Sequence, residues 1–215
     1  MRWQKKARSK EPRKATARGA ATRARIIAAA ADLVCRRGAR ATSLDDIMAA
    51  SATSKSQLYH YFADKDALMR AVIELQTRRV TGGQATLLEA VDTLDRLRGW
   101  RDEVVAMNKA AHSVGGCPLG SLASELADQS ESARAMLADG FGLWRSHLAR
   151  ALRAMRDRGE LKEDAKPEDL ATAVIAALEG GLLLAQTART TRPLELALDM
   201  AIDHVARASQ CGAAA

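Results

Sequence analysis

The sequence predicts an all-α protein, and three observations support this fold class. Hydrophobic residues make up 47% of the 215 residues, enough for a sizeable core, but aromatic residues make up only 3%. Alanine and leucine are the most frequent apolar residues, and both lose little conformational freedom on entering a helix. No run of alternating β-branched residues is long enough to predict a strand. A chain of this length holds one or two domains.

The positive charge is concentrated at the N-terminus. Residues 1–25 hold ten lysines and arginines and one acid, Glu11, which gives a net charge of +9. The whole chain carries +7, so the other 190 residues carry −2. A basic segment on a near-neutral body favours a polyanionic partner at one end, although a solubilising tail would have the same composition. We expect residues 1–19 to form a disordered basic arm and residues 210–215 a flexible tail.

Several classes of protein are disfavoured by the sequence. The apolar run at 26–31 is too short for a signal peptide, and the stretch at 171–185, interrupted by Glu179, is short for a membrane span. We find no nucleophile–base set, phosphate-binding loop or zinc spacing. The three cysteines are too far apart for a disulfide framework or a metal cluster: Cys35, Cys117 and Cys211. We therefore expect a cytoplasmic protein that is not an enzyme, with no cofactor, metal or membrane partner.

The segment after the arm has the spacing of a helix-turn-helix. Residues 20–37 place apolar side chains at helical intervals. Ser43 and Asp46 have the spacing of a capping box, which opens a short helix, and Ser54 and Gln57 form a second capping box. Two short capped helices three or four residues apart, with another helix packed behind them, predict a helix-turn-helix.

The second short helix has one apolar and one polar side. At 100° per residue the inward side carries Leu58, Tyr61 and Phe62. The outward side carries Lys55, Ser56, Gln57, Tyr59 and His60. Hydroxyls and amides at such positions can meet base edges in a major groove, while cations and ring polar groups can reach phosphates. An ordinary surface helix would also have a polar exterior, but the capped turn and the basic arm favour DNA binding.

Residues 20–75 resemble the DNA-binding domain of TetR-family transcriptional regulators, whose pattern is T-R-x-x-I-x-x-A-A…G…T-S-x-x-D-I…S-K-x-x-L-Y-x-[HY]-F-x-x-K-x-x-L. The matching positions are Thr22, Arg23, Ile26, Ala29, Ala30, Leu33, Gly38, Thr42, Asp46, Ile47, Ser54, Lys55, Leu58, Tyr59, Phe62, Lys65 and Leu68. Two residues depart from the pattern, Ala52 and Ser56, which stand where glycine is common. The resemblance implies a DNA-binding domain over 20–66 and a larger helical effector-binding and dimerisation domain over 67–209.

The resemblance also implies which side chains contact DNA. Backbone contacts are expected from Thr42, Lys55, Tyr59, His60 and Lys65. Base contacts are expected from Ser56, Gln57 and Thr53. For Gln57 the capping box is an equally good interpretation, because its amide would then turn back onto Ser54.

The rest of the chain is predicted to be helical. Expected helices span 64–91, with a possible break at Gly82-Gly83, and 94–112, 118–128, 130–158, 167–189 and 193–208. Residues 170–185 are apolar nearly all round, so this helix must be buried on most faces. The resemblance implies dimerisation through the last two helices, and the residues expected there are Ala177, Gly181, Leu184, Leu194, Leu198 and Ile202. A purely internal core is the alternative. A twofold dimer implies a pseudo-palindromic operator with half-sites ~34 Å apart.

An effector pocket is expected where the few aromatic residues gather. The candidate residues are Trp100, Met107, Cys117, Phe141, Trp144, His147, Leu148 and Glu179. Such a cluster is where an apolar ligand would sit, although spacing of this kind is also that of ordinary core.

Cys117 suggests a second kind of input signal. Residues 112–128 resemble the LmrA/YxaF and NemR-type subgroup of TetR regulators, which respond to apolar compounds or reactive electrophiles. Cys117 precedes Pro118 and so falls at a helix N-terminus, where the helix dipole is expected to lower the pKa of a thiol. The sequence therefore predicts a repressor released by a small apolar effector, or a thiol switch at Cys117; an inert buried cysteine is also possible. A non-specific architectural DNA-binding protein is a more remote alternative, since it would not need the large near-neutral body.

Overall fold

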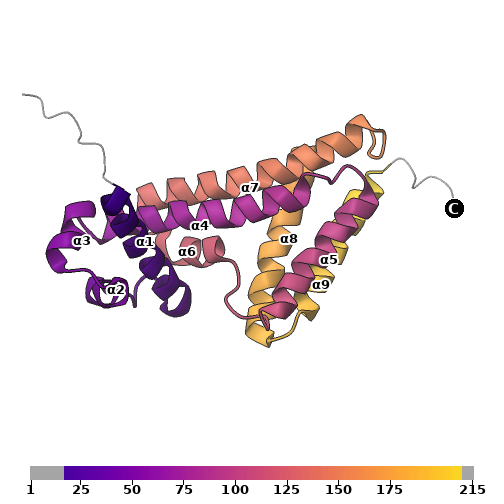
Figure 1. The fold of residues 1–215 in the computed structure, drawn as a ribbon. Helices are drawn as coiled ribbons and strands as arrows, with labels where there is room; N and C mark the ends of the chain where they lie inside the picture. The colour runs from indigo at the N-terminus through magenta and orange to yellow at the C-terminus, as the bar shows by residue number, and fades with distance from the viewer. Residues whose placement is uncertain (1–16, 210–215) are drawn as a thin grey trace, which may run out of the picture.

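The computed structural model describes residues 17–209, and α-helices form almost all the regular structure over that range (Figure 1). These helices are α1 (Ala17–Arg37), α2 (Leu44–Ser51), α3 (Lys55–Tyr61), α4 (Lys65–Leu88), α5 (Leu94–Ala110), α6 (Pro118–Leu126), α7 (Glu131–Asp157), α8 (Pro167–Ala188) and α9 (Arg192–Arg207). Within the described residues the extended pairing is a single bridge between Leu161 and Ser209. The all-α prediction is confirmed.

The predicted helix boundaries agree with the structure to within three residues after residue 64. The exception is the expected break at Gly82-Gly83, which is wrong because α4 continues through both glycines to Leu88. The predicted arm also ends too late, since Ala17–Gly19 already belong to α1. The rest of the arm and the tail at 210–215 lie outside the described residues. The predicted domain boundary at residue 66 falls in the first turn of α4, so one helix joins the two parts.

Helices α1–α3 form one end of the molecule. Both predicted capping boxes are present, at Ser43 with Asp46 and at Ser54 with Gln57. The turn between α2 and α3 contains Ala52 in the left-handed conformation, with φ 47° and ψ 50°, where the family pattern has glycine. Ile26, Ile47 and Leu58 are fully buried and hold the three helices together.

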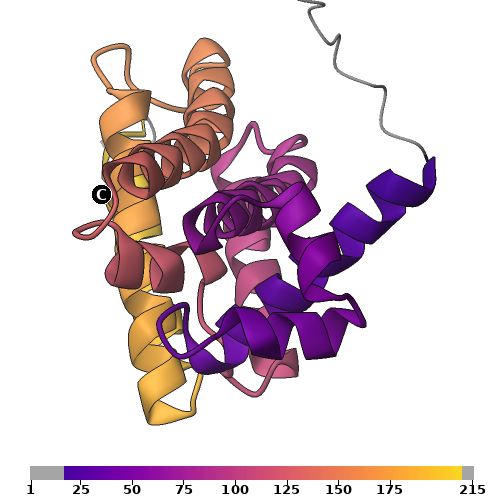
Figure 2. The same ribbon diagram turned by 90° about the vertical axis from the view of Figure 1, so that its left-hand side faces the viewer.

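Helices α4–α9 form the larger part of the fold. Figure 1 shows the long helices α4 and α7 side by side, α6 beneath them, and α5, α8 and α9 at the end away from α3. Figure 2 looks onto the α1–α3 end, with α8 and α9 along the left of the view. Among the described residues α8 is long and apolar enough to cross a membrane by length and composition. It packs against α7 and α9 as a core helix does.

Candidate nucleic-acid interface and ligand cavity

The outward face of α3 is polar and exposed, as predicted. Leu58 is fully buried and Phe62 is 3% exposed, so they anchor the inner side. Every residue of the predicted outer side is exposed to solvent: Lys55, Ser56, Gln57, Tyr59 and His60. The ring of His60 lies edge-on to that of Tyr61, with centroids 4.8 Å apart. The helix therefore presents hydroxyl, amide, imidazole and ammonium groups outward from a fixed apolar base.

Gln57 takes part in the capping box. Its Oε1 accepts a hydrogen bond from the Ser54 N–H at 2.9 Å, while its own backbone N–H donates to the Ser54 hydroxyl at 3.2 Å. The amide oxygen is therefore occupied, and the Nε2 group remains as the part of this exposed side chain that can donate to a base.

Two predicted DNA contacts, Thr42 and Thr53, need correction. Thr42 is fully buried, and its hydroxyl donates to the Gly38 carbonyl at 2.7 Å. Thr53 is 9% exposed, and its hydroxyl shares a hydrogen bond with Ser51 at 2.7 Å. Both hydroxyls hold turns together inside the domain, so neither is presented to an outside ligand.

The turn before α2 is held from two sides. Lys65, predicted to reach a phosphate, donates from Nζ to the Ala39 carbonyl at 2.8 Å. On the other side the Glu125 carboxylate, near the end of α6, accepts the Arg40 N–H at 3.0 Å. Gly38 lies between them at φ +84°, and a Cβ there would come within 2.9 Å of Glu125 Oε1. Sequence reasoning missed Glu125, because nothing local links it to a turn far away in the chain.

Three of the predicted pocket residues meet in one cavity of about 550 Å³. This cavity, called here the apolar cavity, is lined by Arg79, Val80, Gly83, Gln84, Thr86, Leu87, Met107, Gly116, Cys117, Pro118, Trp144 and Leu182. The predicted Met107, Cys117 and Trp144 therefore come together. Trp144 is 3% exposed, and its buried Nε1 has no hydrogen-bond partner.

The structure places the other predicted pocket residues elsewhere. Leu148 is fully buried core. Trp100 is buried outside the apolar cavity, with Nε1 donating to Gln84 at 2.9 Å. Phe141 stacks near Trp144 but lines a separate hollow of about 250 Å³ with Glu179. His147 lies on a different groove. The helical spacing of these residues in the sequence predicted that they face inward, but it could not predict which cavity each one lines.

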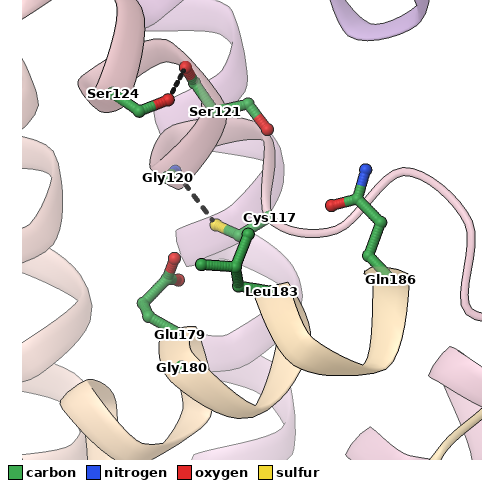
Figure 3. Close-up of a pocket in the computed structure, with 8 residues that line it drawn as sticks. All are labelled: Cys117, Gly120, Ser121, Ser124, Glu179, Gly180, Leu183 and Gln186. Atoms are coloured by element: carbon green, nitrogen blue, oxygen red, sulfur yellow. Dashed lines mark hydrogen bonds between the residues drawn. The ribbon is translucent and has the colours of Figure 1, made fainter. Parts of the chain in front are cut away.

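A second cavity, of about 270 Å³, lies beside the first turn of α6 (Figure 3). We call it the Glu179 cavity, and its lining residues are Cys117, Gly120, Ser121, Ser124, Glu179, Gly180, Leu183 and Gln186. Cys117 lines both cavities. Glu179 reaches it from α8, and Figure 3 shows its carboxylate pointing toward the Cys117 sulfur and Gly120.

Cys117 is at the predicted helix N-terminus, but its predicted acidity is wrong. It is the N-cap of α6, and its Sγ accepts the Gly120 N–H at 3.5 Å. Burial raises the pKa of the thiol, and the neighbouring Glu179 carboxylate raises it further. These effects exceed the stabilisation that the backbone N–H groups give a thiolate. Cys117 is therefore a neutral thiol at physiological pH.

The predicted dimer residues also need correction. Leu194 and Leu198 are fully buried and Ile202 is 4% exposed. A Cβ on Gly181 would lie 3.0 Å from the Leu194 Cα, so this set packs α8 onto α9 within one chain. Ala177 is partly buried, and Leu184 alone of the predicted set is strongly exposed.

A different stripe of the same two helices is apolar and exposed. We call it the α8–α9 face, and its large side chains are Leu183, Leu184, Leu196 and Met200, exposed by 64, 59, 51 and 65%. Leu196 and Met200 are four residues apart on α9, a spacing that marks a second apolar side of that helix. The four-residue spacing of Leu196 and Met200 could therefore have been recognised in the sequence.

The fold and its exposed polar helix define a helix-turn-helix DNA-binding regulator. The family model described as "Bacterial regulatory proteins, tetR family" matches residues 26–72, and that described as "Tetracyclin repressor-like, C-terminal domain" matches residues 93–201. The chain belongs to the TetR family of bacterial transcriptional regulators.

Curated relatives extend this similarity over most of the chain. An uncharacterized HTH-type transcriptional regulator in the lacX 3′ region of Lactococcus lactis is 30% identical over 83% of this chain and 90% of its own. YxaF of Bacillus subtilis is 28% identical over 81% and 90% of the two chains. LmrA of the same species is 26% identical over 80% and 90%.

Solved structures agree with these sequence matches. Escherichia coli NemR in its reduced form has a TM-score of 0.77 at 25% identity, covering 86% of this chain and 97% of its own. A TetR regulator from Chloroflexus aurantiacus has a TM-score of 0.78 at 26% identity, covering 90% and 98%. The predicted similarity to LmrA, YxaF and NemR is confirmed.

Proposed function

We propose that the protein is a cytoplasmic, sequence-specific repressor that binds operator DNA as a homodimer and is released by a small-molecule effector. The observation that carries this proposal is the geometry of α3, whose polar side is exposed over a buried apolar base. A helix held in this way can enter a major groove, with Ser56 and Gln57 toward base edges and Lys55, Tyr59 and His60 toward phosphates. Thr42 and Thr53 stabilise the domain instead, whereas Lys65, which spends one N–H on the Ala39 carbonyl, keeps two donors for a phosphate.

Dimerisation is supported by the α8–α9 face. Four large apolar side chains are exposed on two helices that pack together, and exposed apolar surface beyond single scattered residues is typical of interaction sites. Two copies of such a face, related by a twofold axis, would form a closed four-helix interface. The two α3 helices would then meet successive major grooves, so the operator is expected to be pseudo-palindromic.

Helix α6 supplies a physical link between effector and operator. Its first turn lines the Glu179 cavity through Cys117 and Gly120, and Glu125 in its last turn binds the turn that leads into α2. A ligand that shifts α6 would therefore shift this turn and bias the separation of the two α3 helices.

Reversible binding explains the structure better than a thiol switch. The thiolate is the reactive form of cysteine, and the raised pKa of Cys117 keeps the thiol neutral. The cavities on either side of Cys117 are instead large enough for a ligand. Covalent modification of Cys117 remains the second candidate for the input signal, because this side chain borders both cavities.

Selection of bound duplexes from a random pool tests the function directly. We expect recovery of a pseudo-palindromic site with half-sites about one helical turn apart. Recovery of unrelated sequences would contradict sequence-specific binding, because that is the result expected of a non-specific architectural protein. Recovery of single half-sites would contradict binding as a dimer.

A further inference from the structure

The lining of the Glu179 cavity carries one acidic side chain and no basic one. Its lining supplies one carboxylate, two serine hydroxyls, one glutamine amide and one thiol, and it includes no lysine, arginine or histidine (Figure 3). The amide oxygen of Gln186 lies against Gly116 at the rim. An anionic ligand would be repelled here, whereas a cation would find no competitor among the lining residues.

The partly buried Glu179 carboxylate has no ion-pair partner within the described residues, and the Cys117 thiol is its hydrogen-bond partner. Its Oε1 is buried and makes no hydrogen bond within the described residues. Buried carboxylates are almost always paired, since an unpaired one loses hydration without compensation. Burial raises the pKa of Glu179, and the Cys117 thiol offsets this effect only in part. The site is therefore incomplete as it stands, and a donor with positive charge would complete it.

Gly120 makes room for this carboxylate. A Cβ at Gly120 would collide with Oε2 of Glu179. Position 120 lies inside α6, where alanine is a better helix former than glycine. The absence of a side chain at this position is therefore explained by the space that the carboxylate occupies.

We propose that the Glu179 cavity binds a small organic ammonium ion, which donates N–H hydrogen bonds to the Glu179 carboxylate. The inference rests on the proposed function and names the class of effector. A protonated amine supplies both the charge and the donor that Oε1 lacks, whereas a neutral alcohol supplies only the donor. The cavity volume of about 270 Å³ is at the small end for ligand sites, which favours an amine with a short apolar chain.

Calorimetry on the full-length protein tests the ligand class with three probes of equal chain length: n-hexylammonium, 1-hexanol and hexanoate. We expect n-hexylammonium to bind at least tenfold more tightly than 1-hexanol, and hexanoate not to bind. Glu179→Gln should reduce the preference for ammonium over alcohol to less than twofold. Glu103→Gln, on the exposed side of α5, is the matched control and should leave the preference unchanged.

A second variant tests the same site in case Glu179→Gln does not fold. Gly120→Ala should displace the carboxylate and weaken ammonium binding at least fivefold, while thermal unfolding shows an intact fold. Gly99→Ala is its control, because a Cβ at Gly99 meets nothing within 4 Å, and it should bind as the native protein does. Equal binding of alcohol and ammonium, no binding of n-hexylammonium, or undiminished ammonium binding in both Glu179→Gln and Gly120→Ala would overturn the proposal.

The same protein preparation is also titrated with the operator duplex recovered by selection. Specific duplex binding without ammonium binding overturns the ligand class and leaves the repressor function standing. Ammonium binding without specific duplex binding overturns the repressor function and leaves the ligand class standing.

Discussion

Substituting glutamate for Met200 should dissociate the dimer that the α8–α9 face is proposed to form. Full burial of a large apolar side chain contributes about 1.5–3 kcal/mol. Met200 is 65% exposed in the single chain, so about two-thirds of this amount, roughly 1–2 kcal/mol, is available for association. Because a twofold interface contains two copies, the loss doubles to about 2–4 kcal/mol, which weakens dimerisation roughly 30- to 700-fold.

Sedimentation equilibrium over a concentration series measures this change. Leu143→Glu is the matched control, because Leu143 is also a large apolar side chain exposed to solvent, at 45%, but lies on α7. We expect Leu143→Glu to keep the native dimer dissociation constant. An unchanged constant for Met200→Glu, or dissociation by Leu143→Glu alone, would refute the assignment of the face.

The remaining predictions concern other parts of the mechanism. Ser56→Ala should change the preferred bases in a repeated selection, whereas His60→Ala should weaken all duplexes about equally; a uniform loss for both would remove Ser56 from base reading. Ala52→Gly should raise the free energy of unfolding by about 1 kcal/mol, because it relieves the left-handed alanine at φ 47°; thermal unfolding measures it, and a lower melting temperature would contradict the strain. Glu125→Ala should abolish the change that operator binding causes in amide exchange at the first turn of α6, because coupling between two sites is reciprocal; a persistent change would place the link elsewhere. In a variant in which Cys35 and Cys211 are replaced by serine, Cys117 should react with iodoacetamide at pH 7.5 at least tenfold more slowly than free cysteine, because its pKa is raised. Faster reaction would favour the thiol switch.

Local features of the fold could be predicted from the sequence because neighbours in the chain determine them. The capping boxes at Ser43 and Ser54 depend on residues three positions apart, and the structure contains both. The exposed face of α3 follows from helical periodicity around Leu58. In each case no distant residue was needed to specify the arrangement.

Features that depend on distant residues could not be predicted in the same way. Periodicity showed that Leu194 and Leu198 lie on an apolar side of α9, but not that α8 of the same chain covers that side. The position of Cys117 at a helix N-terminus was correct, yet its pKa is governed by burial and by Glu179 from another helix. The bond from Arg40 to Glu125 joins residues that no local pattern connects.

The central claim is that the protein reads DNA sequence through α3, and a competition titration tests it most directly. The selected duplex and a scrambled duplex of the same composition are compared at physiological salt. We predict a preference of about 10³-fold or more for the selected duplex, as specific regulators show, and its collapse when Ser56 and Gln57 are both changed to alanine. Equal affinity for the two duplexes, or an undiminished preference in the double variant, would contradict the claim.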